Sequence, residues 1–150
     1  MRKLIVVEDD LDDFLLLEQA LRKAGISNSI FHLKNGDEAL AYFTNETESP
    51  NIWEEAYPPI MILIDLHLVG KDGWYFLSEL KSQAVTRAIP LIVLSGVKDE
   101  REVNLCYQKG ANAFLCKQTD FEGFCKAIQK LKAFWWDTAV LPYCEDINRK

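Results

Sequence analysis

The chain has 150 residues, of which 49% are hydrophobic and 27% charged, a balance typical of one globular domain. Its formal net charge of -6 argues against a nucleic-acid-binding protein, which would need a basic patch. Acidic residues within the first ten positions argue against a signal peptide, and the apolar runs are too short to cross a bilayer, so we expect a cytoplasmic protein with no membrane segment.

Short apolar runs alternate along the chain with stretches whose apolar residues recur at helical spacing. The runs predict strands and the periodic stretches predict helices. In chain order the predicted elements are a strand at 4–7, a helix at 12–25, a strand at 29–33, a helix at 36–43, a strand at 60–64, a helix at 72–82, a strand at 90–96, a helix at 101–110, a strand at 112–117 and a helix at 121–135. Strands that are apolar throughout and separated by helices predict an α/β fold, in which a doubly wound parallel five-stranded sheet is covered on both faces. Flavodoxin-like and Rossmann-like sheets are the two common forms, and no glycine-rich nucleotide motif favours the second.

Two segments fall outside this repeat. Residues 44–59 are polar and contain proline, and they are predicted to form a long loop before the third strand. Residues 136–150 follow the last predicted helix and form a C-terminal extension whose apolar beginning should pack on the domain. We therefore expect one domain over residues 1–135, with the extension at 136–150.

Polar residues follow four of the five predicted strands. Because functional residues of a parallel α/β sheet lie beyond the carboxyl ends of its strands, we expect these side chains to meet at one edge. The residues are Glu8, Asp9 and Asp10 after the first strand, Asp65 after the third, Ser95 after the fourth and Lys117 after the fifth. Gathered carboxylates repel one another, and a hard dication such as Mg²⁺ compensates them through oxygen ligands. In such a site Asp65 can attack a phosphorus centre, and Lys117 can neutralise the oxygens of the transferring group.

Asp9, Asp10, Asp65, Ser95 and Lys117, in this order on these strand ends, resemble the receiver domain of two-component response regulators. The resemblance covers roughly residues 3–135 and implies a flavodoxin-like (βα)5 fold. The long loop and the ending at 133–142 are similar to the small single-domain regulators of cyanobacterial phytochromes.

The resemblance implies a role for each site residue and a set of partners. Asp65 is the expected phospho-acceptor, with Asp10 as a direct magnesium ligand, Asp9 as a helper and the backbone carbonyl of His67 completing the metal shell. Ser95 and Phe114 are the expected switch residues. The expected partners are a sensor histidine kinase, here of phytochrome type, and a second copy of the chain. The expected homodimer is built on the fourth and fifth helical layers and the C-terminal tail. The protein would then be a phosphorylated signalling protein and not an enzyme.

Three other functions stay open at this point. The chain can be an intermediate that passes the phosphoryl group onward, or a receiver that binds partners without phosphorylation. Gln118 keeps the second of these open, because the family usually has proline after the lysine. A magnesium-dependent phosphohydrolase is disfavoured, because such enzymes of the haloacid dehalogenase type need a second aspartate where His67 stands.

Overall fold

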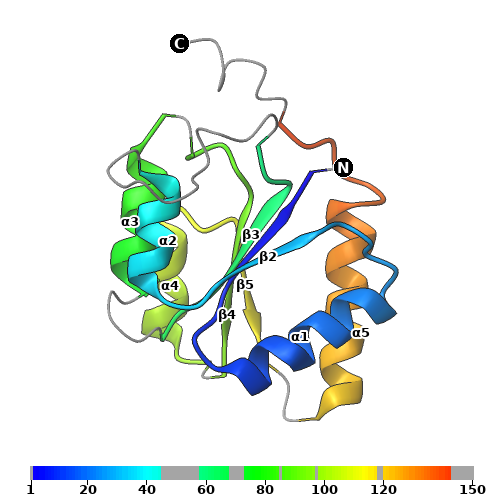
Figure 1. Ribbon diagram of the computed structural model, residues 1–150. Coiled ribbons are helices and arrows are strands. Elements are labelled where there is room, and N and C mark those ends of the chain that lie inside the picture. Colours follow the sequence, from blue (N-terminus) through cyan, green and yellow to red (C-terminus); the bar gives the residue numbers. More distant parts are fainter. Residues whose placement is uncertain are drawn as a thin grey trace.

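The computed structural model describes residues 2–44, 58–67, 73–84, 86–96, 98–117 and 120–142. Over these residues five strands alternate with five helices. They are β1 (Leu4–Val7), α1 (Leu11–Lys23), β2 (Ile30–Leu33), α2 (Gly36–Phe43), β3 (Met61–Asp65), α3 (Gly73–Ser82), β4 (Leu91–Ser95), α4 (Glu100–Gln108), β5 (Ala113–Cys116) and α5 (Phe121–Trp135). The strands pair in parallel in the order β2-β1-β3-β4-β5, which confirms the predicted flavodoxin-like α/β fold (Figure 1).

The predicted boundaries agree with these elements to within two residues, and the differences have local causes. Helix α1 begins at Leu11 because Asp10 is the N-cap. The Asp10 side chain accepts a hydrogen bond from the backbone N–H of Asp13. The helix ends at Lys23, and Gly25 follows with a φ of +88°, a conformation that favours glycine. Strand β3 extends one residue further than predicted and contains Asp65 as its last residue.

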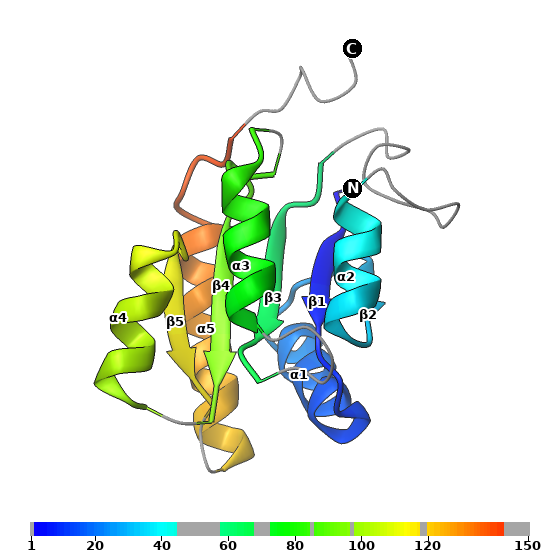
Figure 2. The same ribbon diagram turned by 90° about the vertical axis from the view of Figure 1, so that its left-hand side faces the viewer.

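Two apolar layers cover the two faces of the sheet, with α2, α3 and α4 on one face and α1 and α5 on the other (Figure 2). Alternate residues of each strand point to opposite layers, as the twofold period of a strand requires. In β1, Ile5 and Val7 pack in the layer of α2 and α3, whereas Leu4 and Val6 pack in the layer of α1 and α5. The central strands β1, β3 and β4 are buried throughout, so the sheet forms a rigid base for the residues at its edges.

The close approach of α3 to the end of β3 depends on Gly73, the first residue of α3. Its backbone N–H donates to the carbonyl oxygen of Leu66 at 3.0 Å. A Cβ atom on Gly73 would lie 2.5 Å from that oxygen and 2.8 Å from the Leu66 Cα. The turn after Asp65 is therefore packed directly against the start of α3.

The first residues of the predicted extension pack on the domain, at the end of the sheet where the strands begin. The indole N–H of Trp136 donates to Asn28 Oδ1 at 2.9 Å, and Asn28 Nδ2 donates to the carbonyl of Arg2 at 2.7 Å. The Arg2 guanidinium in turn donates to the carbonyls of Pro58 and Pro59, at the end of the predicted long loop.

Residues 45–57, most of that loop, lie outside the described residues, as do Gln118 and residues 143–150. None of the described helices is both long enough and apolar enough to cross a membrane.

Candidate functional site

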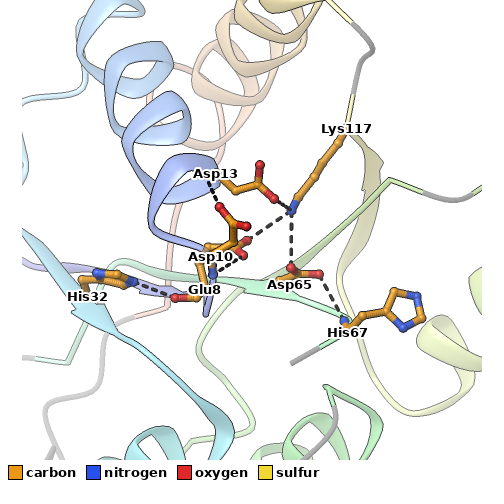
Figure 3. Close-up of polar contacts among 7 residues, drawn as sticks. All are labelled: Glu8, Asp10, Asp13, His32, Asp65, His67 and Lys117. Atoms are coloured by element: carbon orange, nitrogen blue, oxygen red, sulfur yellow. Dashed lines mark hydrogen bonds and ion pairs between the residues drawn. The ribbon is translucent and has the colours of Figure 1, made fainter. Parts of the chain in front are cut away.

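The carboxyl ends of the strands meet at one edge of the sheet, where Glu8, Asp65 and Lys117 lie together (Figure 3). The strand register is the reason: Val7 pairs with Ile64, Asp65 pairs with Leu94, and Ser95 pairs with Cys116. Residues that directly follow β1 and β5 therefore lie level with the ends of β3 and β4. Their positions depend on backbone pairing between buried strands, which holds them firmly.

Lys117 reaches across the sheet to three carboxylates. Its Nζ atom lies 3.1 Å from Glu8 Oε2, 3.3 Å from Asp13 Oδ2 and 3.4 Å from Asp65 Oδ2. The first and third of these partners have side chains only 3% and 12% exposed, so their charges are poorly screened by water. Burial alone would lower the pKa of Lys117, but the charges of Glu8, Asp65 and Asp13 outweigh burial and raise it above its ordinary value. The ammonium group is thus held charged beside the Asp65 carboxylate.

Glu8 is the most deeply buried acid of the site. Its burial, followed by the nearby charge of Asp65, raises the pKa of Glu8 to about 8, although the Lys117 charge acts in the opposite direction. One lysine therefore does not fully compensate the acids gathered around it. A site of this kind favours an added cation.

Glu8, Asp9 and Asp65 form a cluster in which one oxygen atom from each lies within 4.8 Å of the others. A group of carboxylate oxygens matches the oxygen ligands that Mg²⁺ and related hard cations take. The sequence predicted Asp9 and Asp10 as the acidic pair, and the structure differs in one member. Asp10 is exposed and serves as the N-cap of α1, so Glu8 completes the cluster in its place.

The remaining predicted residues lie around this cluster. Ser95 is fully buried at the end of β4, and its carbonyl accepts a hydrogen bond from the Lys117 N–H at 2.7 Å. Phe114 of β5 is half-buried against the apolar layer of α2, α3 and α4, and its N–H donates to the hydroxyl of Tyr107 at 3.2 Å. The backbone N–H of His67 donates to Asp65 Oδ1 at 3.1 Å, which places the turn after β3 directly beside Asp65.

Glu8 was predicted to lie at this edge but was given no part in the metal site, and Asp13, beside Lys117, was not predicted. For Glu8 the signal was present, because it is the first residue after the buried strand β1. For Asp13 the signal was weaker, because an acid in the first turn of a helix is favoured by the helix dipole in any protein.

Comparison with known proteins gives one consistent result. Residues 4–129 match the family model of the response regulator receiver domain. The chain is 30% identical to response regulator Rcp1 of Synechocystis sp. over 139 residues, which cover 93% of this chain and 92% of Rcp1.

Solved structures agree with the sequence relatives. The phosphorylated cyanobacterial phytochrome response regulator RcpA superposes with a TM-score of 0.83 at 31% identity, covering 94% of this chain and 98% of RcpA. The Mn²⁺-bound form of Rcp1 superposes with a TM-score of 0.81 at 30% identity, covering 95% of this chain and 99% of that structure. The chain therefore belongs to the response regulator receiver domain family, and it is similar over nearly its full length to phytochrome response regulators.

Proposed function

We propose that this protein is a single-domain response regulator that accepts a phosphoryl group from a histidine kinase on the carboxylate of Asp65. The observation that carries the proposal is the position of Asp65, at the end of a buried strand, beside the Lys117 ammonium group and the acids Glu8 and Asp9. This arrangement supplies a nucleophile, a fixed positive charge and oxygen ligands for a cation within one site.

In the proposed transfer a carboxylate oxygen of Asp65 attacks the phosphorus atom of a phosphohistidine. A phosphorus–oxygen bond forms, the phosphorus–nitrogen bond breaks, and the bonding electrons return to the imidazole of the donor. The His67 N–H, 3.1 Å from Asp65 Oδ1, orients the carboxylate for this attack. The Lys117 ammonium group, 3.4 Å from Asp65 Oδ2, stabilises the negative charge of the transferring oxygens.

Glu8, Asp9, Asp65 and the carbonyl of His67 are the groups that would hold a magnesium ion. When bound, Mg²⁺ supplies positive charge that offsets the acids and the incoming phosphoryl oxygens. Two observations support this assignment: the carboxylate oxygens converge within 4.8 Å, and the related Rcp1 has a Mn²⁺-bound form. Asp10 takes no part in this proposal, because its side chain caps α1.

Ser95 and Phe114 are the proposed switch residues. The Ser95 hydroxyl would bond a phosphoryl oxygen on Asp65, and the resulting shift of β4 would let the Phe114 ring change its packing. Phe114 is only half-buried and packs at the edge of the apolar layer, which supports a change of position at modest cost. The altered surface would then lie over α4, β5 and α5. We propose that this surface and the C-terminal tail form a homodimer.

We place the protein itself in the cytoplasm. The proposed phosphoryl donor is a sensor histidine kinase of phytochrome type, as the relatives suggest. A cavity of about 160 Å³ beside Lys117 supports contact with a donor protein at this edge. Leu16, Leu17 and Phe121 contribute to its apolar lining, and Leu11 and Leu15 are exposed elsewhere on α1. Signalling by phosphorylation, and not turnover of a metabolite, is the activity we assign.

The test is phosphoryl uptake from a phosphorylated histidine kinase in the presence of Mg²⁺, measured by intact mass. We expect wild type to gain one phosphoryl group that hydroxylamine releases, as an acyl phosphate should, and Asp65→Asn to gain none. Asp12→Asn is the matched control, because Asp12 is an exposed acid of α1 outside the cluster. Equal uptake by Asp65→Asn would overturn the proposal.

Sedimentation with and without beryllofluoride tests the dimer. If beryllofluoride increases the mass of wild type but not of Asp65→Asn, Asp65 controls assembly. Onward transfer to a second histidine protein would identify a relay intermediate, and partner binding independent of the analogue would identify a receiver that works without phosphorylation.

A further inference from the structure

A second contact joins the turn after β3 to helix α4, away from Lys117. His67 Nε2 lies 3.5 Å from Oε1 of Glu102, which is in the first turn of α4. The His67 side chain is 54% exposed and that of Glu102 26%, so the pair lies at the surface but is partly shielded. Figure 3 shows the imidazole of His67 directed away from Asp65 and Lys117.

His67 thus contacts two parts of the molecule at once. Its backbone N–H bonds Asp65 Oδ1, and its side chain contacts Glu102. Phosphorylation consumes one oxygen of Asp65 and changes the charge of the carboxylate that this N–H bonds. A change at Asp65 therefore acts directly on the residue that holds Glu102, without passing through Ser95 or Phe114.

Glu102 is poorly satisfied in this arrangement. Its second oxygen, Oε2, is buried and has no hydrogen-bond partner among the described residues. Its charge also faces the buried Cys106 thiol, whose pKa is raised to about 11, by burial first and by Glu102 second. A buried carboxylate oxygen without a donor costs free energy, so the contact with His67 is held at a cost that a movement of α4 can relieve.

We propose that Glu102 is a positioning residue that, through His67, stabilises the unphosphorylated arrangement of the acceptor turn against α4. The inference rests on the proposed function of Asp65 and adds a second route from Asp65 to α4. Because coupling between two sites is reciprocal, a contact that favours the unphosphorylated state must weaken binding of a phosphoryl group at Asp65. Removing the contact should therefore strengthen that binding.

The experiment is a calorimetric titration with beryllofluoride at saturating Mg²⁺. We expect Glu102→Gln to bind the analogue about two- to fivefold more tightly than wild type, the range that one partly exposed polar contact can supply. Glu100→Gln is the matched control, because Glu100 is an exposed acid in the same helical turn, and it should bind like wild type. His67→Ala removes the same contact from the other side, and adding Glu102→Gln to His67→Ala should change the affinity no further.

The outcomes separate this inference from the proposed function. If wild type fails to bind beryllofluoride, or Asp65→Asn binds it equally well, the proposed function fails. If wild type binds but Glu102→Gln behaves like Glu100→Gln, or binds more weakly, only the role of Glu102 is overturned. An effect of Glu102→Gln that persists in the His67→Ala background also overturns it. Unfolding midpoints are measured alongside, because a merely structural role would lower stability without tightening binding.

Discussion

Lys117 and Glu8 are 109 positions apart in the sequence, and their side chains form the shortest of the three ionic contacts at the site, with Nζ 3.1 Å from Oε2. The same ammonium group lies 3.4 Å from Asp65 Oδ2. In the proposed function Lys117 therefore has two roles, because it contacts the buried acids before phosphorylation and faces the acceptor oxygen during it.

Lys117→Met should separate these two functions. Without the ammonium group the buried Asp65 carboxylate loses its ion pair and Glu8 loses a hydrogen-bond donor, and we expect the metal-free protein to lose about 1–3 kcal/mol of stability at neutral pH. Mg²⁺ should bind the variant more tightly than wild type, because a competing positive charge has been removed, whereas phosphoryl uptake should fall. Urea unfolding in a chelator and a Mg²⁺ titration measure these effects, and weaker Mg²⁺ binding by the variant would contradict this account.

Glu8 should make the stability of the metal-free protein fall as pH rises. Its pKa is raised in the folded state to about 8, from 4.5, so between these values the folded protein holds a proton that the unfolded chain releases. Stability should therefore decrease across this window, by at most about 1.4 kcal/mol per pH unit. Urea unfolding in a chelator at several pH values should show this slope in wild type and lose it in Glu8→Gln. Saturating Mg²⁺ should also flatten it, and equal slopes in both proteins would exclude Glu8 as its source.

Asp9 and Asp10 are adjacent, but substituting them should affect different properties: Mg²⁺ binding for Asp9 and helix stability for Asp10. Asp9→Ala should weaken Mg²⁺ binding strongly and leave α1 intact, because Asp9 belongs to the acidic cluster. Asp10→Ala should retain Mg²⁺ binding and lose about 1 kcal/mol of stability, the usual cost of removing an N-cap. Calorimetric Mg²⁺ titration together with thermal unfolding distinguishes the two. Loss of Mg²⁺ binding in Asp10→Ala would restore the ligand pair predicted from the sequence.

Gly73→Ala should destabilise the protein, because the added Cβ would lie 2.5 Å from the Leu66 carbonyl oxygen, which is backbone and cannot move aside easily. We expect a loss of about 1–3 kcal/mol, as for other overpacked sites. Gly96→Ala is the control, since a Cβ there meets nothing within 4 Å. The midpoints of urea unfolding compare the two variants, and a Gly73→Ala protein as stable as Gly96→Ala would show that α3 can shift away from β3.

Trp136→Phe tests the packing of the C-terminal extension. It keeps most of the apolar surface but removes the hydrogen bond to Asn28 Oδ1, for which we expect a loss of about 1 kcal/mol. Thermal unfolding measures this loss. The same change in an Asn28→Ala background should have a smaller effect, and equal effects in both backgrounds would show that the bond contributes nothing.

Most of the site was predictable from the sequence because parallel strands place their carboxyl ends at one edge. Asp65, Ser95 and Lys117 each end or directly follow an apolar run, and a shift of one residue in a strand boundary leaves each of them at that edge. The fold followed from the same alternation of apolar runs and helical periodicity.

The acids that form a cluster with Asp65 were harder to predict, because Glu8, Asp9 and Asp10 are consecutive and all carry carboxylates. Which of them face the sheet edge depends on the residue at which β1 ends and α1 begins, and boundaries are the least predictable feature of an element. The available signal for the role of Asp10 was the preference of aspartate for the N-cap position of a helix. The contact between His67 and Glu102 had no sequence signal, because it joins a turn and a helix start through side-chain geometry alone.

The hydrogen bond between Trp136 and Asn28 anchors residues 136–142 at the end of the sheet where the strands begin (Figure 1). Asp65 lies at the opposite end, where β3 finishes. A fluorophore or a sensor surface attached at Pro142 would therefore leave the edge of the sheet that carries Asp65 facing solution. Kinase association can then be followed in real time on immobilised protein without the attachment point obstructing the approach.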